Sequence, residues 1–220
     1  MDFLKEELGK VISKPNVNLA DELIYICQNY FDKPVHNMTD LKKKNQKLKG
    51  DIFECFCLLY MKYVYKLEKI WLLHETPEDV LLKVGLKRKD MGIDLIGQDK
   101  IGDYYAIQAK YRKRNKNKKT TITWKQLSTF YALVLKTGPF KKHIVFTNAD
   151  SARHVGNKTD KDLTITYNRL NKITHFEWLQ MLELETKTDK YESSVEKKKL
   201  SIEQIRQKRL LYFSKNHTIV

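Results

Sequence analysis

Cysteine is scarce in this sequence, and the few that occur follow no metal or disulfide pattern. The three cysteines among 220 residues are Cys27, Cys55 and Cys57, and none belongs to a CxxC pair. They provide no disulfide framework, so we expect free, buried thiols and a reducing compartment. The six histidines show no zinc-like spacing either. The sequence thus argues against a disulfide-stapled secreted domain and against a zinc module.

Long apolar runs are also missing. No segment approaches the roughly 20 apolar residues that a helix needs to cross a bilayer. The first ten residues, MDFLKEELGK, do not have the pattern of a signal peptide. We therefore expect a soluble intracellular protein, of the cytoplasm or the nucleus, with no membrane partner.

Basic charge, in contrast, is in excess. The chain has 42 Lys and Arg against 27 Asp and Glu, which gives a net charge of +15 and a pI of about 9.5. In the segment KYRKRNKNKK, residues 110–119, seven of ten residues are basic. Clustered basic charge favours a polyanionic partner, and nucleic acid is the commonest one. The alternative is that the charge only keeps the protein soluble.

Hydrophobic periodicity predicts an ordered core in the middle of the chain. The predicted elements are a helix from residue 51, strands at 69–75, 92–97 and 103–112, a helix from residue 124 and a strand at 143–149. Asp51 is expected to cap the first helix, and Thr123 to cap the second in a capping box with Gln126. This order predicts an α/β domain around a mixed sheet.

The flanking segments differ from this core in composition. Residues 1–45 hold two helical patterns with apolar stripes and predict a helical N-terminal extension. The core domain is expected over residues 46–185. Residues 186–220 begin as a polar linker and end in a basic amphipathic helix. That helix is interpreted either as a further DNA contact or as a docking site for a partner.

Polar residues interrupt the apolar hairpin of residues 92–112. Gln108 and Lys110 are two residues apart on the second strand, so their side chains point to the same face. Asp94 lies on the preceding strand and is expected beside them. Glu54 is the only charged residue in the segment IFECFCLLYM, and an unpaired buried carboxylate costs several kcal/mol. A hard cation such as Mg²⁺ would compensate for this cost, because it binds carboxylate, amide and carbonyl oxygens.

Each of these residues alone also has a structural explanation. Asp94 is consistent with a turn or edge residue. Glu54, if it lies in the first turn of its helix, interacts favourably with the helix dipole. Gln108 and Lys110 are consistent with a solvated strand face. A shared site, however, explains all four positions at once.

The motif around these residues resembles the PD-(D/E)xK nuclease superfamily. A G-I-D segment is followed by a turn and a strand ending in Q-A-K, and a helix opening G-D-I-F-E precedes them. The chain is most similar to the Mrr-type restriction-endonuclease branch, in which glutamine replaces the usual acidic residue of the last motif. The resemblance covers roughly residues 50–148, and Ile93 replaces the proline of the family pattern. It implies a restriction-endonuclease-like fold with an αβββαβ core.

The resemblance further implies a metal-dependent endonuclease that hydrolyses phosphodiester bonds in DNA. The implied catalytic residues are Asp94, Gln108, Lys110 and Glu54. The implied ligands of Mg²⁺, which Mn²⁺ would replace, are Asp94, Gln108, the backbone carbonyl of Ala109, and Glu54. The neutral Gln108 lowers the negative charge of this site. Contacts to the DNA backbone are expected from the basic segment that follows, at Arg112, Lys113, Arg114, Lys116, Lys118 and Lys119.

Other functions are compatible with the same residues. One is a catalytically silent nucleic-acid-binding module of the same fold. Another is a structure-selective resolvase of branched DNA, which would act as a homodimer because it cuts two strands symmetrically. A third is an RNA-directed nuclease or RNA-binding protein. Double-stranded DNA is the expected partner, and the resemblance also allows a helicase or another DNA-processing module, to which similar domains are attached.

Overall fold

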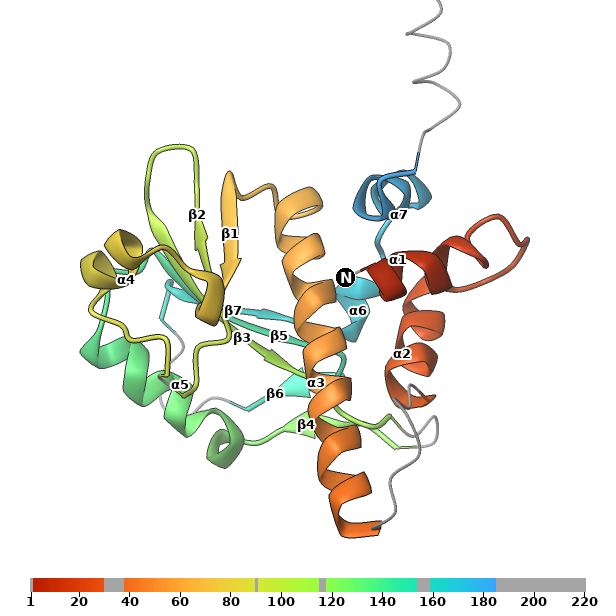
Figure 1. Ribbon diagram of the computed structural model, residues 1–220, viewed down its shortest axis with the longest axis horizontal. Coiled ribbons are helices and arrows are strands. Elements are labelled where there is room, and N and C mark those ends of the chain that lie inside the picture. The colour runs from red at the N-terminus through yellow and green to blue at the C-terminus, as the bar shows by residue number, and fades with distance from the viewer. Residues whose placement is uncertain (1, 30–37, 90, 115–117, 154–158, 185–220) are drawn as a thin grey trace, which may run out of the picture. The chain divides into compact units, whose positions relative to one another are not determined.

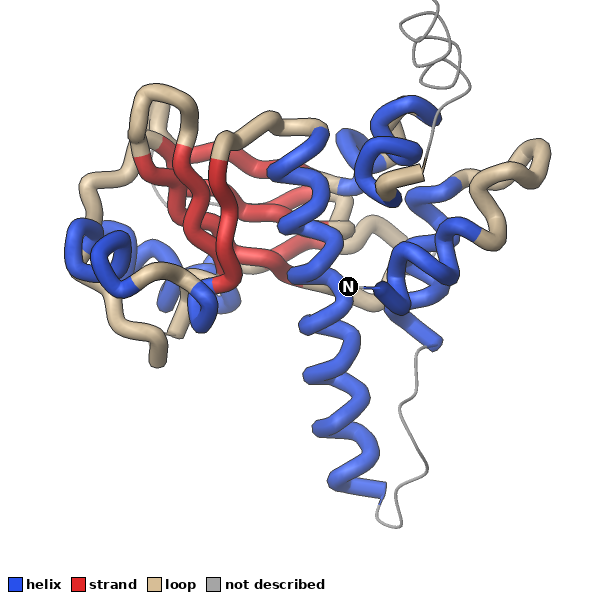
Figure 2. The backbone as a smooth tube through the Cα atoms, turned by 45° about the horizontal axis from the view of Figure 1, so that its top comes forward, coloured by secondary structure: helices blue, strands red, loops and turns tan. Residues whose placement is uncertain are grey.

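The computed structural model describes residues 2–29, 38–89, 91–114, 118–153 and 159–184 (Figures 1 and 2). The predicted linker and basic helix over 186–220 lie outside these residues, as does Lys116. The helices are α1 (Asp2–Gly9), α2 (Leu19–Asn29), α3 (Met38–Tyr63), α4 (Glu78–Val84), α5 (Trp124–Lys136), α6 (Tyr167–Leu170) and α7 (His175–Leu182). None of the helices within the described ranges combines the length and the apolar character that a bilayer span requires.

A mixed sheet lies at the centre of the fold. Its strands are β1 (Lys69–Leu72), β2 (Leu95–Gln98), β3 (Tyr104–Lys110), β5 (Lys142–Thr147) and β7 (Asp162–Ile165), which neighbour one another in that order. The β1–β2 and β2–β3 pairs are antiparallel, whereas β3–β5 and β5–β7 are parallel. Two short strands, β4 (Thr121–Ile122) and β6 (Ser151–Ala152), form a separate parallel pair. The predicted α/β class, the mixed sheet and the αβββαβ order are confirmed.

Helices cover both faces of this sheet (Figures 1 and 2). Alternate residues of β3 point to opposite faces, so Ile107 packs with the buried residues of α3, whereas Ala106 packs with those of α4 and α5. The amide of Thr123 donates to Oε1 of Gln126 at 3.0 Å, which confirms the predicted capping box at the start of α5.

The N-terminal helices share the core of the sheet domain. Leu4 of α1 and Leu23 of α2 are buried in the same hydrophobic cluster as Phe53 of α3 and Ile107 of β3. The predicted domain boundary after residue 45 falls inside α3, and residues Met1–Leu182 form one compact unit. The helical extension is therefore part of the domain and supplies one side of its core.

Two local predictions are wrong. Asp51 does not cap α3, because this helix begins at Met38 and runs through Gly50 and Asp51 without a break. A glycine in a helix interior costs only about 1 kcal/mol relative to alanine, and the Lys-, Leu- and Gln-rich residues before it favour the helix. The strand expected over 69–75 ends at Leu72 and continues as a 3₁₀ turn, which a 3.0 Å hydrogen bond from the Thr76 hydroxyl to the Leu72 carbonyl helps to close.

Candidate active site

The predicted site residues lie at one end of the central sheet, where β3 and β5 end and β2 begins. A cavity of about 530 Å³ opens there between α2, α3 and β3. Its lining residues are Gln28, Gln46, Lys49, Gly50, Glu54, Asp94, Ala109, Lys110, Tyr111, Arg112 and Lys113. Of the predicted catalytic and metal-binding set, the structure thus brings Glu54, Asp94, Ala109 and Lys110 to one cavity wall. Gln108 is not among the lining residues.

Asp94 is held in place by the neighbouring strand. The antiparallel register pairs Leu95 with Ile107, so its continuation sets Asp94 opposite Gln108. The Asp94 amide donates to the Ile107 carbonyl at 2.9 Å, and the Ala109 amide donates to Oδ2 of Asp94 at 2.8 Å. These bonds fix the orientation of the carboxylate and leave its other oxygen available for a ligand.

The glycine of the G-I-D motif allows the chain to reach this position. Gly92 has a φ of +116°, in the region that L-residues rarely adopt. A Cβ added there would lie 2.9 Å from the backbone nitrogen of Phe130 in α5. Only glycine fits at position 92, because of the positive φ and because α5 approaches closely. This turn leads directly into Asp94, two residues later.

Glu54 lines the same cavity as Asp94, from the interior of α3. Because α3 begins at Met38, Glu54 is far from the first turn, and the helix-dipole explanation does not apply. Burial, reinforced by the negative charges of Asp94 and Asp51, raises the pKa of Glu54 to about 7. Burial also raises the pKa of Asp94, although Lys110 and the Ala109 amide oppose this rise. Two carboxylates with raised pKa values in one cavity favour a bound cation.

Gln108 is buried beside this wall with an unsatisfied oxygen. Only 2% of the residue is exposed, and no donor among the described residues reaches its Oε1. Buried polar atoms are normally hydrogen-bonded, so an unpaired one calls for an explanation. A cation at the cavity would provide one, because an amide oxygen is a suitable ligand for it.

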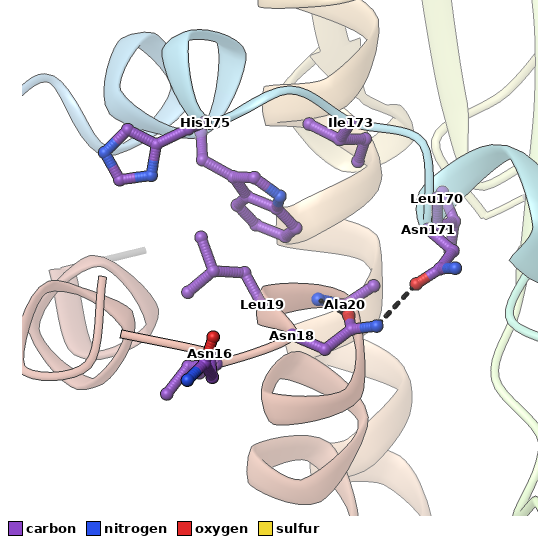
Figure 3. Close-up of a pocket in the computed structure, with 10 residues that line it drawn as sticks. Asn16, Asn18, Leu19, Ala20, Leu170, Asn171, Ile173 and His175 are labelled. Carbon is purple, nitrogen blue, oxygen red and sulfur yellow. Dashed lines mark hydrogen bonds between the residues drawn. The ribbon is translucent and has the colours of Figure 1, made fainter. Parts of the chain in front are cut away.

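A second cavity, of about 320 Å³, lies between the start of α2 and the α6–α7 segment (Figure 3). A hydrogen bond of 2.6 Å from Asn18 Nδ2 to Asn171 Oδ1 crosses its wall. No carboxylate or lysine occurs among the described residues that line it, which include Asn16, His175 and Trp178. Its one titratable side chain among these described residues is His175, so this cavity lacks the paired carboxylates and the lysine that the first cavity has.

Comparison with known families gives one match. A family model described as "Restriction endonuclease", of the Mrr type, matches residues 61–205, which is more than half of the chain. The chain belongs to this restriction endonuclease family. No curated protein and no solved structure matches it. The matched segment contains Asp94, Gln108 and Lys110 and begins after Glu54.

Membership of the restriction endonuclease family supports a nuclease that acts on DNA. The family is typically dependent on a divalent metal, and the donors at the cavity fit such an ion. Within the described ranges, no three His, Cys, Asp or Glu side chains gather into a metal-binding group. A metal at this site would therefore have at most two carboxylates, from Asp94 and Glu54, and amide, carbonyl or water oxygens would fill the rest. That composition suits Mg²⁺ better than a transition metal.

The residues predicted to contact DNA lie in different environments. Arg112 and Lys113 line the cavity beside Lys110. Arg114 instead forms an ion pair with Asp150 at 3.0 Å and lies over the ring of Tyr167 at 3.5 Å. Lys118 and Lys119 are exposed beyond the cavity, and Lys116 lies outside the described residues.

Sequence reasoning missed several residues around this site. Gln28 lines the cavity from α2, which the prediction assigned to a separate extension, and Gln46 lines it from the N-terminal half of α3, where no site residue was predicted. Asn148 was predicted only as part of the strand at 143–149, yet it follows the strand, is fully buried and accepts a hydrogen bond from the Arg112 amide. The signal for Asn148 was available, since a polar residue directly after a buried strand at the site end of a sheet is a candidate for function.

Proposed function

We propose that this protein is a divalent-metal-dependent endonuclease that hydrolyses phosphodiester bonds in DNA. The observation that carries the proposal is the group of Glu54, Asp94 and Lys110 around one cavity. The two carboxylates have raised pKa values, and the unpaired oxygen of Gln108 lies beside them. In a member of the restriction endonuclease family, this arrangement supports hydrolysis at a phosphate.

The residues that would hold the metal are Asp94, Gln108 and Ala109, through a carboxylate, a side-chain amide oxygen and a backbone carbonyl. Glu54 would complete the set directly or through a water molecule. Mg²⁺ is the ion that these hard oxygen donors favour, and Mn²⁺ is expected to replace it. When bound, the ion would lower the pKa of a coordinated water and polarise the phosphate.

Lys110 supplies the cationic group of the reaction. Its side chain shares the cavity with both carboxylates. Its positive charge opposes the rise in pKa that burial causes at Glu54 and Asp94. An ammonium at this position would orient the attacking water and offset the negative charge that develops on the phosphate in the transition state. Glu54 and Asp94 would also orient the water through their free oxygens. The exposed lysines beyond the cavity would bind neighbouring phosphates without reading sequence.

The expected substrate is double-stranded DNA, because clustered basic residues flank the cavity and the family supports DNA as substrate. A homodimer and a helicase or other DNA-processing partner stay predictions. Native mass, together with a comparison of four-way junctions and linear duplex, tests the resolvase alternative. A dimer that cuts junctions in preference to duplex would favour it.

The test of the proposed function compares wild type with Lys110→Ala on labelled plasmid and linear DNA. Each protein is assayed with Mg²⁺, with Mn²⁺ and with EDTA, while DNA binding is measured at two salt concentrations. Lys100→Ala, at the exposed hairpin turn, is the matched control. We expect metal-dependent cutting by wild type and control, and a loss of about 10²–10³-fold in Lys110→Ala with binding retained. Binding by wild type without cutting under any metal would instead indicate a silent nucleic-acid-binding module.

A further inference from the structure

Hydrogen bonds join the C-terminal end of β3 and the residues after it to the C-terminal end of β5 and the residue after it. The Thr147 hydroxyl donates to the Lys110 carbonyl at 2.6 Å. Two residues further on, the Arg112 amide donates to Asn148 Oδ1 at 2.7 Å, and Asn148 Nδ2 donates to the Arg112 carbonyl at 2.6 Å. Both Thr147 and Asn148 are fully buried. One asparagine side chain thus satisfies both backbone groups of Arg112, which requires a donor and an acceptor on the same side chain.

Two arginines on this segment differ in how their guanidinium groups are satisfied. Arg114 pairs with Asp150 at 3.0 Å, donates from Nη1 to the Asn148 carbonyl at 2.9 Å and stacks over Tyr167. Its charge is compensated within the protein, which indicates a structural role.

Arg112 lacks this compensation. Its Nη1 donates to the Tyr111 carbonyl at 3.0 Å, but its Nε is buried and has no acceptor among the described residues. No carboxylate in the described part of the chain forms an ion pair with it, and burial lowers the pKa of its guanidinium. A partly buried cation without an anion costs free energy, which an anionic ligand would offset.

The position of Arg112 identifies the chemistry of that ligand. Arg112 lines the same cavity as Glu54, Asp94 and Lys110. The planar guanidinium presents N–H groups in a fixed fork that matches two oxygens of a phosphate, which a lysine does not reproduce. The Nε is covered in this structure, so a phosphate in this cavity would reach it after a turn of the Arg112 side chain, and it would lie beside the groups assigned to hydrolysis.

We propose that Arg112 binds the phosphate group undergoing hydrolysis through its Nε and a terminal nitrogen, and that Asn148 is the positioning residue that aims it. This assignment rests on the proposed function and deepens it, since Arg112 would bind the reacting phosphate and not a neighbouring phosphate of the DNA backbone. Arg114 has no such role. The contact strengthens as charge develops on the phosphate, so its loss lowers the rate of cutting more than the affinity for DNA.

The experiment measures single-turnover cleavage with Mg²⁺, with protein in excess over DNA so that all of the DNA is bound, together with DNA affinity in EDTA. Arg112→Ala and Arg112→Lys are both expected to cut about 10²–10³-fold more slowly, with DNA affinity reduced less than about tenfold. Lysine keeps the positive charge but lacks the planar pair of N–H groups. A slow Arg112→Lys variant would therefore show that the geometry of the guanidinium matters, and not only its charge. Added guanidinium ion is expected to restore part of the rate of Arg112→Ala and none of the rate of Asn148→Ala, in which the cavity already holds the misaimed arginine.

Thermal unfolding provides a readout that is independent of activity. Arg112→Ala removes an uncompensated cation and is expected to unfold at the wild-type temperature or above it. Arg114→Ala removes an ion pair and a ring contact and is expected to unfold at a lower temperature. A clear drop in the unfolding temperature of Arg112→Ala would show that this side chain is structural and would overturn the assignment.

The outcomes of these experiments also distinguish a failure of the Arg112 assignment from a failure of the proposed function. If wild type cuts DNA and both Arg112 variants cut within about threefold of it when all of the DNA is bound, the Arg112 assignment alone is overturned. The same conclusion follows if the variants lose affinity without losing rate. If wild type cuts no DNA with Mg²⁺ or Mn²⁺, the proposed function fails, and the Arg112 assignment fails with it.

Discussion

The two ends of the central sheet carry similar charged residues but satisfy them differently. At the hairpin end, between β2 and β3, Lys141 forms ion pairs with Asp99 and Asp103, each at 2.8 Å. On the neighbouring strands, His143 lies 3.3 Å from Asp162. At the cavity end, among the described residues, Gln108 Oε1 and Arg112 Nε have no partner.

The acidic residues show the same contrast in their pKa values. The hydrogen bond from Lys141 lowers the pKa of Asp99 at the hairpin end. At the cavity end, burial raises the pKa values of Asp94 and Glu54. Native proteins normally satisfy their buried polar groups, so a cluster of unsatisfied groups marks a place where the protein binds something else. The comparison therefore supports the proposal that the cavity end is the functional end.

The sharpest test of this contrast exchanges one aspartate at each end for asparagine. Asp94→Asn removes a charged metal ligand and is expected to reduce DNA cleavage by more than about 10²-fold, since loss of even outer-shell metal partners costs 10–100-fold. Asp99→Asn keeps the acceptor for the turn amides of Ile101 and Asp103 and is expected to stay within about threefold of wild type, as other surface changes do. Initial rates on plasmid DNA measure both. Equal losses would remove the distinction between the two ends.

The pH dependence of stability offers a second test, at Glu54. Between its ordinary pKa of 4.5 and its folded pKa of about 7, Glu54 holds a proton in the folded state that it releases on unfolding. Its contribution to the free energy of unfolding is therefore fully present below pH 4.5 and is lost as the pH rises to about 7. Without metal, Glu54→Gln is expected to be more stable than wild type at pH 8 by up to about 3 kcal/mol, and equally stable near pH 4.

Urea unfolding in EDTA at a series of pH values measures this difference. Asp162→Asn is the control from the hairpin end, where hydrogen bonds from Thr159 and His143 lower the pKa of the carboxyl against the effect of burial. The contribution of Asp162 is present above its unfolded pKa and is lost as the pH falls, so the two variants differ in the sign of their effect. A Glu54→Gln curve that stays parallel to wild type across this range would contradict the raised pKa.

The smallest expected effect concerns the exposed lysines. Lys113→Ala and Lys118→Ala each remove one contact to the DNA backbone, so each is expected to reduce the slope of log K against log salt by about 1. Lys100→Ala, at the hairpin end, is expected to leave the slope unchanged. Fluorescence anisotropy on duplex DNA over a range of salt concentrations measures the slopes. The same slope for all three variants would mean that the DNA does not lie across the cavity end.

Local sequence signals predicted much of this architecture. The strands β3 and β5 were predictable because nearly continuous apolar runs are typical of strands buried on both faces. Asp94 and Lys110 were predicted as site residues because they are polar residues at the ends of apolar strands, and their roles stay predictions. The start of α3 was missed because a Gly-Asp pair normally signals a helix N-terminus, and the helix propensity of the basic residues before it prevailed.

Residues brought to the cavity by long-range packing were not predictable in this way. Gln28 reaches the cavity only because the apolar face of α2 packs on α3, which no local pattern specifies. The difference between Arg112 and Arg114 depends on Asp150 and Tyr167, which lie far from both arginines in the sequence. A basic run in a sequence therefore indicates the sign of the partner's charge. Only the fold shows which of its basic side chains already have partners within the protein.

The most direct test of the central claim is a calorimetric titration of metal-free protein with Mg²⁺ and with Mn²⁺. Wild type, Asp94→Asn and Asp99→Asn are compared under the same conditions, without DNA. The account predicts one binding site in wild type, the same site in Asp99→Asn and no detectable site in Asp94→Asn. The same binding curve in all three proteins, or no binding of either ion to wild type, would contradict the assignment of the cavity as a divalent-metal site.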